Sequence, residues 1–161
     1  PDTEQDVAMV SVLERFGRNG NKSLAFCSGW KLKKGAMASS AAPDDNNLVV
    51  MGVNAEDMSI AVNYLIEQGG GQVVVADGEI LEFLPLPVGG IVSDREPEEI
   101  AAHEKLIDQA ARSLGSDLPD PMMYMFFLPI TAIPDYAITD VGPVDYVNLR
   151  TFEPVLNVRE K

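Results

Sequence analysis

The first half of the chain places short apolar runs between turn-forming residues, a pattern that predicts β-strands. Val7–Leu13 and Leu24–Ser28 flank the turn-rich joint F-G-R-N-G-N-K, and we expect them to pair. A further short strand is predicted within Ala36–Ala42. Leu48–Val53 is a continuous apolar run, which is typical of a strand covered on both faces.

A helix is predicted directly after Leu48–Val53. Asn54 is a good N-cap, and Asp57 lies near the positive end of the helix dipole. Gly69 opens a triple glycine that ends the helix, since glycine takes the left-handed C-cap conformation without cost. The apolar residues fall on one stripe: Met58, Ala61, Val62, Leu65 and Ile66.

The next segment predicts a β-hairpin. Gln72–Ala76 and Glu79–Leu84 flank an Asp-Gly pair, which favours a type I′ turn because both central residues need a positive φ. Pro85 and Pro87 cannot donate to a ladder, so the second strand should end there or lie at a sheet edge.

A second long helix is predicted over Glu98–Leu114. Ser93 and Glu96 have the spacing of a capping box, Pro97 suits the first turn, and Gly115 ends the helix.

The last third of the chain gives weaker signals. Met122–Ile130 is the most hydrophobic segment, and its periodicity does not decide between a short buried helix and a strand. Tyr136–Asp140 and Val144–Leu149 are predicted strands around Gly142-Pro143. Together the elements predict a single α+β domain, in which a mixed or mostly antiparallel sheet packs against one layer containing two main helices.

Composition narrows the class of function. The 161 residues suit one domain, and their 46% hydrophobic content suits a globular core. A net charge of −13 argues against nucleic-acid binding, because phosphate repulsion would dominate the long-range field. Six of the twelve basic residues lie between Val7 and Ala42, where they suit either an acidic partner surface or, more simply, solvated hairpin ends.

The sequence contains no sign of membrane insertion or secretion. No apolar run reaches the roughly 20 residues of a membrane span, and the start P-D-T-E-Q-D is unlike a signal peptide. Cys27 is the only cysteine, in an apolar run that predicts a small buried hydrophobe rather than a nucleophile. These features favour a reducing cytoplasm.

The residues offer little for metal catalysis. His103 is the only histidine, so no H-x-H element exists, and there is no D-x-D-x-D-G loop. We expect His103 to be a partly exposed helix residue, and we expect no metal or other cofactor to be bound by this chain.

The loop Pro43–Asn47 is the best candidate site. Asp44 and Asp45 could form an acid/base pair at the mouth of a sheet, with the Asn47 amide beside them. The alternative is a structural turn, for which Pro, Asp and Asn are the usual residues. Gly89-Gly90 could also approach a ligand, but the predicted capping role of Ser93 accounts for that segment.

Four motifs carry a resemblance to a known family. They are G-A-M-A-S-S-A-A-P-D-D-N-N (Gly35–Asn47), N-A-E-D-M-S-I-A-V-N, G-G-G-Q-V-V-V-A-D-G-E-I-L and L-P-L-P-V-G-G-I-V-S-D (Leu84–Asp94). With them, the stretch from about Val7 to Asp145 resembles the C-terminal domain of adenine deaminases. The resemblance implies hydrolysis of adenine to hypoxanthine and ammonia by a metal-dependent amidohydrolase barrel, which this chain lacks.

The resemblance also implies partners and a cofactor. The barrel would lie in the same polypeptide and hold a pair of divalent metals of the Mn or Fe type. Adenine would be the small-molecule ligand, and a homo-oligomer is expected. This chain by itself is then predicted to be inactive.

The candidate loop departs from the pattern of the family, which typically reads A-H-D-S-H-N. Asp44 and Asn47 match it, whereas Pro43 and Asn46 stand at the histidine positions and Asp45 replaces the serine. The family also tends to carry histidines after the Glu-Arg of its first strand, where this chain has Phe-Gly. The resemblance therefore carries over Asp44 and Asn47 as substrate or partner contacts and, more weakly, Asp45, Ser39 and Ser40.

Two other functions remain open from the residues. One is a stand-alone ligand-binding or assembly module without catalysis, which has kept the fold and lost the histidines. The other is an unrelated hydrolase built on Asp44 and Asp45.

Overall fold

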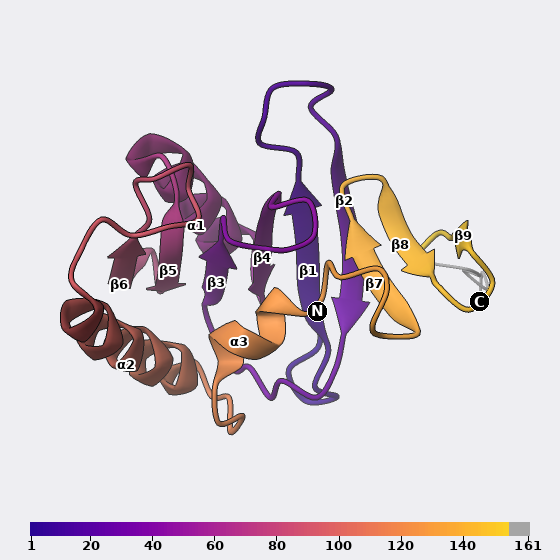
Figure 1. Ribbon diagram of the computed structural model, residues 1–161. Coiled ribbons are helices and arrows are strands. Elements are labelled where there is room, and N and C mark those ends of the chain that lie inside the picture. Colours follow the sequence, from indigo (N-terminus) through magenta and orange to yellow (C-terminus); the bar gives the residue numbers. More distant parts are fainter. Residues whose placement is uncertain (155–161) are drawn as a thin grey trace.

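An antiparallel sheet of six strands forms the centre of the computed structural model, which describes residues 1–154 (Figure 1). The strands lie in the order β2-β1-β4-β3-β5-β6, and each neighbouring pair is antiparallel. Their bounds are β1 (Ala8–Leu13), β2 (Lys22–Cys27), β3 (Ala36–Ser39), β4 (Leu48–Gly52), β5 (Gly71–Ala76) and β6 (Glu79–Pro85). The predicted pairing of the first two strands is confirmed, and the fold is α+β.

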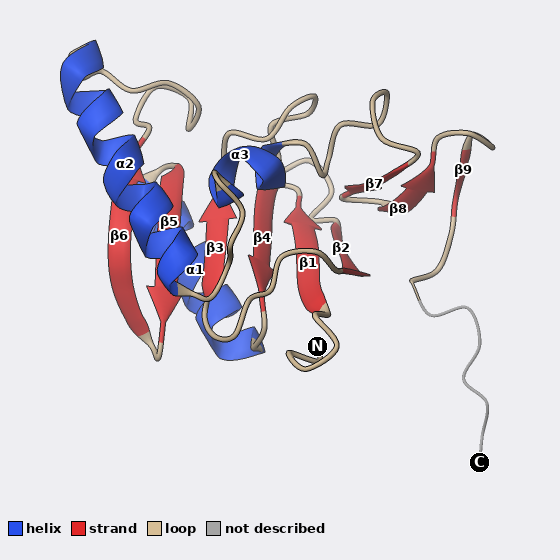
Figure 2. Cartoon of the chain, turned by 90° about the horizontal axis from the view of Figure 1, so that it is seen from below, coloured by secondary structure: helices blue, strands red, loops and turns tan. Residues whose placement is uncertain are grey.

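Helices cover both faces of this sheet, so the expectation of one helical layer is wrong. Helix α1 (Ala55–Gln68) packs on one face, while α2 (Pro97–Ser113) and α3 (Pro121–Phe126) pack on the other. Figure 2 shows α2 in front of the sheet and α1 behind it. Strands β3 and β4 are buried at every residue, and a strand buried on both faces requires cover on both sides.

Local signals place α1 and the β5–β6 hairpin as predicted. The Asn54 side chain accepts a hydrogen bond from the Asp57 backbone N–H at 2.8 Å, and Gly69 ends the helix with a φ of 77°. Asp77 and Gly78 both have positive φ, as a type I′ turn requires. Strand β6 is an edge strand that ends at Pro85.

The start of α2 differs from the prediction. Glu96 is the N-cap residue and makes no side-chain capping bond, whereas Pro97 is the first helical residue. The Ser93 hydroxyl accepts a hydrogen bond from the Arg95 backbone N–H at 3.3 Å instead of capping a helix. Because proline already fixes a helical φ, the helix begins at Pro97 without a capping box.

The remaining chain forms α3 and a small second sheet. Met122–Ile130 begins inside α3, whose first turn is capped by Asp120, so this part of the segment is helical. The sheet comprises β7 (Tyr136–Thr139), β8 (Gly142–Asp145) and β9 (Arg150–Thr151), beside β1 and β2 in Figure 1. The predicted bounds of the second strand, Val144–Leu149, are wrong: Gly142 and Pro143 pair with β7, the turn lies at Asp140-Val141, and residues 146–149 form a further turn.

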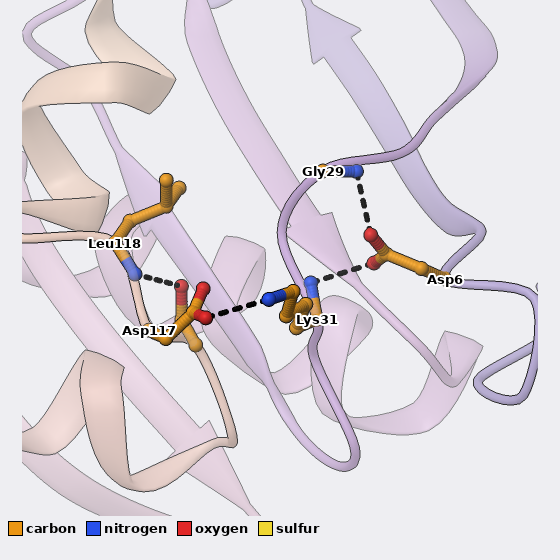
Figure 3. A network of polar contacts seen from close by, with 6 residues as sticks. Asp6, Gly29, Lys31, Asp117 and Leu118 are labelled. Atoms are coloured by element: carbon orange, nitrogen blue, oxygen red, sulfur yellow. Dashed lines mark hydrogen bonds and ion pairs between the residues drawn. The ribbon is translucent and has the colours of Figure 1, made fainter.

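A polar network ties the β2–β3 connection to the segment after α2 (Figure 3). The Asp6 carboxylate accepts hydrogen bonds from the backbone N–H groups of Gly29, at 2.7 Å, and Lys31, at 2.6 Å. The Lys31 ammonium in turn donates to Asp117 at 2.6 Å. This network fixes the lower end of the sheet in Figure 1, away from the candidate loop.

None of the helices within residues 1–154 has both the length and the apolar character needed to cross a membrane.

Candidate functional site

Four segments meet at one end of the main sheet, the upper end in Figure 1. Because neighbouring strands run in opposite directions, the connections after β1, β3 and β6 and the one before β5 emerge together. We call this end the loop edge; it comprises residues 14–21, 40–47, 69–70 and 86–96. The candidate loop of the sequence lies at its centre.

Arg15 joins three segments of the loop edge. Its Nε donates to the Asn46 carbonyl at 2.5 Å, and an Nη donates to the Gly89 carbonyl at 2.7 Å. The guanidinium lies 4.6 Å from the centre of the Phe16 ring. Burial lowers the pKa of Arg15 below its usual value, but arginine remains charged in proteins. Within residues 1–154, no carboxylate lies within ion-pair distance of it.

Glu14, one residue earlier, organises the loop between β1 and β2. Its carboxylate accepts hydrogen bonds from the backbone N–H groups of Phe16, Arg18, Asn19 and Gly20, at 2.6 to 3.3 Å. Desolvation raises the pKa of Glu14, but these four bonds outweigh it and hold the pKa below its usual value. The loop therefore has a defined shape although it is exposed.

Ser40 connects the candidate loop to two glycine segments. Its buried hydroxyl accepts from the Gly71 N–H at 2.8 Å and donates to the Gly90 carbonyl at 2.5 Å. The backbones touch here, since a Cβ added to Gly70 would lie 2.4 Å from the Gly90 Cα. Glycine at position 70 is therefore required by the close approach of the two backbones, whereas a Cβ at position 90 would meet the Arg15 guanidinium.

Asn47 and Asp45 form a closed pair within the candidate loop. Asp45 accepts the Asn47 backbone N–H at 2.9 Å and its side-chain amide at 2.8 Å. The Asn47 side-chain oxygen is 3.4 Å from the Arg15 backbone nitrogen, which donates to it. Asp44 is exposed, and its carboxylate accepts no hydrogen bond from residues 1–154.

A small cavity of about 200 Å³ opens at the loop edge. It is lined by Arg15, Ser40, Leu48, Leu65, Ile66, Gly69 and Gly70. Small-molecule sites usually enclose about 300–1,000 Å³. The loop edge thus offers one wall of a ligand site rather than a complete one.

Comparison with known proteins identifies the family. The family model described as the adenine deaminase C-terminal domain matches residues 1–150. The chain belongs to this adenine deaminase C-terminal domain family. It is 82% identical over 155 residues to Adenine deaminase 1 of Desulfotalea psychrophila, covering 96% of this chain and 26% of that protein.

Two further relatives give the same relationship. Adenine deaminase 1 of Latilactobacillus sakei is 65% identical over 158 residues, covering 98% of this chain and 27% of that protein. Adenine deaminase 4 of Rhizobium meliloti is 58% identical over 154 residues, covering 96% of this chain and 26% of that protein. The chain therefore spans about a quarter of the length of these relatives and matches their C-terminal part.

The family domain brings together some of the predicted site residues. Asn47 and Ser40 belong to the network around Arg15 and Gly90, whereas Ser39 is buried and bonds locally to Ala41. Asp44 lies at the exposed rim, where a contact with a ligand or partner remains a prediction. Asp45 has both oxygens engaged by Asn47, an arrangement that favours the structural turn over an acid/base pair.

Sequence reasoning missed the roles of Arg15 and the Gly89-Gly90 pair in this family domain. Both lie in sequence noted above, but their contacts are long-range. Arg15 and Gly89 are 74 residues apart, and Ser40 and Gly90 are 50 residues apart. One signal was present: paired glycines just after a strand and two prolines. The predicted capping role of Ser93 explains the same segment without these contacts, and the structure contradicts that role.

The described residues offer no metal site of their own, and the resemblance puts the metal pair in the barrel. Within residues 1–154, no group of three or more His, Cys, Asp and Glu side chains is arranged to hold a metal ion. His103 lies on α2, half-buried, with Nε2 3.3 Å from a Glu82 carboxylate oxygen. Burial, with a smaller effect from the Asp6 charge, raises the pKa of Cys27 to about 12, so its thiol is a poor nucleophile.

Proposed function

We propose that this chain is the C-terminal domain of an adenine deaminase, an enzyme of purine salvage that hydrolyses adenine to hypoxanthine and ammonia. The observation that carries the proposal is the match to the family over residues 1–150, together with 82% identity to a protein named Adenine deaminase 1. The chemistry belongs to the rest of the polypeptide, an amidohydrolase barrel with a pair of divalent metals. Such a pair activates water and polarises the carbon that is attacked.

The contribution of this domain is the loop edge, which we place against the mouth of the barrel. Its cavity of about 200 Å³ needs a second wall to enclose a purine. The Arg15 side chain donates hydrogen bonds to both the segment that carries Asp44 and the segment that carries Gly89, and so fixes their positions relative to each other. Asp44 then offers an exposed carboxylate that can accept a hydrogen bond from an amine or amide N–H.

The cellular context follows from the same assignment. We propose that the whole enzyme works in the cytoplasm and assembles as a homo-oligomer. Its ligand would be adenine, held between the barrel and the loop edge. The domain by itself would not turn adenine over, because the metal pair would lie in the barrel.

A chimera tests the proposal. The matching 155-residue segment of Adenine deaminase 1 from Desulfotalea psychrophila is replaced by this chain; we refer to this protein as the chimera. Purified with Mn²⁺ or Fe²⁺, it should convert adenine to hypoxanthine at a rate within about tenfold of the parent enzyme. The matched control is the parent truncated before the segment, which should lose most of its activity.

Two results would contradict the proposal. A chimera that folds and binds metal but forms no hypoxanthine would show that this chain does not support deamination. Calorimetric binding of adenine to the 161-residue chain, combined with an inactive chimera, would favour the stand-alone binding module instead.

A further inference from the structure

The two faces of the main sheet are covered unequally. Helix α1 contacts β3, β4, β5 and β6 on its face, whereas Met9 and Leu13 of β1 are only partly buried beside it and, among residues 1–154, no helix packs on this face of β2. On the opposite face, the same two strands are covered by the small sheet of β7 and β8. In Figure 1, α1 lies over the β5 side of the sheet, several strands away from β2.

Strands β1 and β2 and helix α1 form the walls of an open groove of about 700 Å³, which is larger than the cavity of about 200 Å³ at the loop edge. Leu24 of β2 is 43% exposed in it. Its lining comes from β1, β2, β4 and α1: Met9, Ser11, Leu13, Lys22, Ser23, Leu24, Val50, Ala55, Met58, Ser59, Val62 and Asn63.

The chemistry of this groove is unlike that of the rest of the chain. Charged residues make up 23% of the sequence, but Lys22 is the only charged residue in the lining. Depletion of charge is the compositional mark of the core of an interface. A contiguous exposed apolar patch on a soluble domain likewise indicates a surface that is covered by a partner.

We propose that an apolar segment of the remaining polypeptide docks in this groove, as an amphipathic helix lying beside α1. This inference rests on the proposed function, in which the chain is one domain of a longer enzyme. The relatives are about four times as long as the matched part, so most of their polypeptide lies outside it. A helix there would complete the layer that α1 begins, at the usual interaxial distance of about 8–10 Å.

The net charge favours this occupant over a second copy of the chain. Each copy carries a net charge of −13, so two copies repel one another as they approach. A segment of the same polypeptide is instead held near the groove at a high effective concentration, so two separate molecules do not have to associate for it to bind.

Thiol labelling of the chimera tests the proposal with a matched pair of positions. Leu24 on edge strand β2 is 43% exposed, and Leu81 on edge strand β6 is 42% exposed. Leu24→Cys and Leu81→Cys chimeras are labelled with a maleimide, folded and in urea, and the modified peptides are quantified by mass spectrometry. If nothing covers the groove, equal exposure gives equal protection at both positions.

We expect at least tenfold slower labelling at position 24 than at position 81 in the folded chimera, and equal rates in urea. Equal folded rates would overturn the proposal. Protection at position 24 that disappears on dilution would also overturn it, because a second copy would then be the occupant.

The labelling result is independent of the enzymatic result. Protection at position 24 in a chimera without deaminase activity would support the docking groove and contradict the proposed function. Normal deaminase activity with equal labelling at both positions would support the proposed function and contradict the docking groove.

Discussion

The guanidinium of Arg15 donates a hydrogen bond to the backbone carbonyl of Gly89, 2.7 Å away, although 74 residues separate them in sequence. The same side chain holds the carbonyl of Asn46. One cation thereby orders the segments that follow β1, β3 and β6. A hydrogen bond from a charged donor is stronger than a neutral one, so the shape of the loop edge depends on this residue.

Gly90→Ala should displace Arg15 and loosen the loop edge. A Cβ at position 90 would lie 2.6 Å from an Arg15 Nη, so the guanidinium must move. Gly69→Ala is the matched control, because both glycines have a φ of +77° and position 69 has open space around it. Urea denaturation should show Gly90→Ala to be less stable than the control by about 1–2 kcal/mol. Equal losses would mean that Arg15 adapts without cost.

Ser40→Ala should destabilise the domain by about 1–3 kcal/mol. The substitution leaves the Gly71 N–H and the Gly90 carbonyl without the hydroxyl that joins them, in a buried position. Ser113→Ala is the control, since that serine is exposed on α2 and should change stability by no more than about 0.5 kcal/mol. Thermal unfolding of both variants measures the difference, and similar midpoints would contradict the bridging role of Ser40.

Elements that are specified by neighbouring residues could be predicted from the sequence. The Asn54 cap acts within a single helical turn, and the Asp-Gly turn needs only its own two φ angles. The predicted capping box at Ser93 is wrong because a second local signal decides where the helix begins. Pro97 is the first helical residue, so the N-cap position falls on Glu96. The two-sided burial of Leu48–Val53 was recognised, although the helix layer on the second face was not inferred from it.

The loop edge could be predicted only in part. The candidate loop was found from its residue types, but its partners lie far along the chain. The contacts Arg15–Gly89 and Ser40–Gly90 exist only because the strand order brings their segments to one end of the sheet. No local pattern fixes that order, and two antiparallel neighbours such as β3 and β5 are separated by a whole helix.

Asp44→Asn and Asn47→Ala should separate ligand contact from turn structure in the chimera. Asp44 is exposed and unbonded within residues 1–154, so its substitution should leave stability within about 0.5 kcal/mol and lower kcat/KM if it contacts substrate or barrel. Asn47→Ala breaks the pair with Asp45 and should cost about 1–3 kcal/mol of stability. Unchanged kcat/KM in Asp44→Asn would rule out Asp44 as a contact.

Glu14→Gln should change how the stability of the domain depends on pH. The folded-state pKa of Glu14 lies below its usual 4.5, because four backbone N–H bonds outweigh desolvation. Its contribution is therefore present above pH 4.5 and is lost as the pH falls through the folded-state pKa. Urea midpoints from pH 7 to pH 3 should show the variant to be less stable at pH 7 and to converge on the unmodified chain in acid.

Glu67→Gln is the control, since no hydrogen bond to that carboxylate exists within residues 1–154, and its urea midpoints should equal those of the unmodified chain at every pH. A deficit in Glu14→Gln that stays constant with pH would show that the ionised carboxylate does not hold the loop.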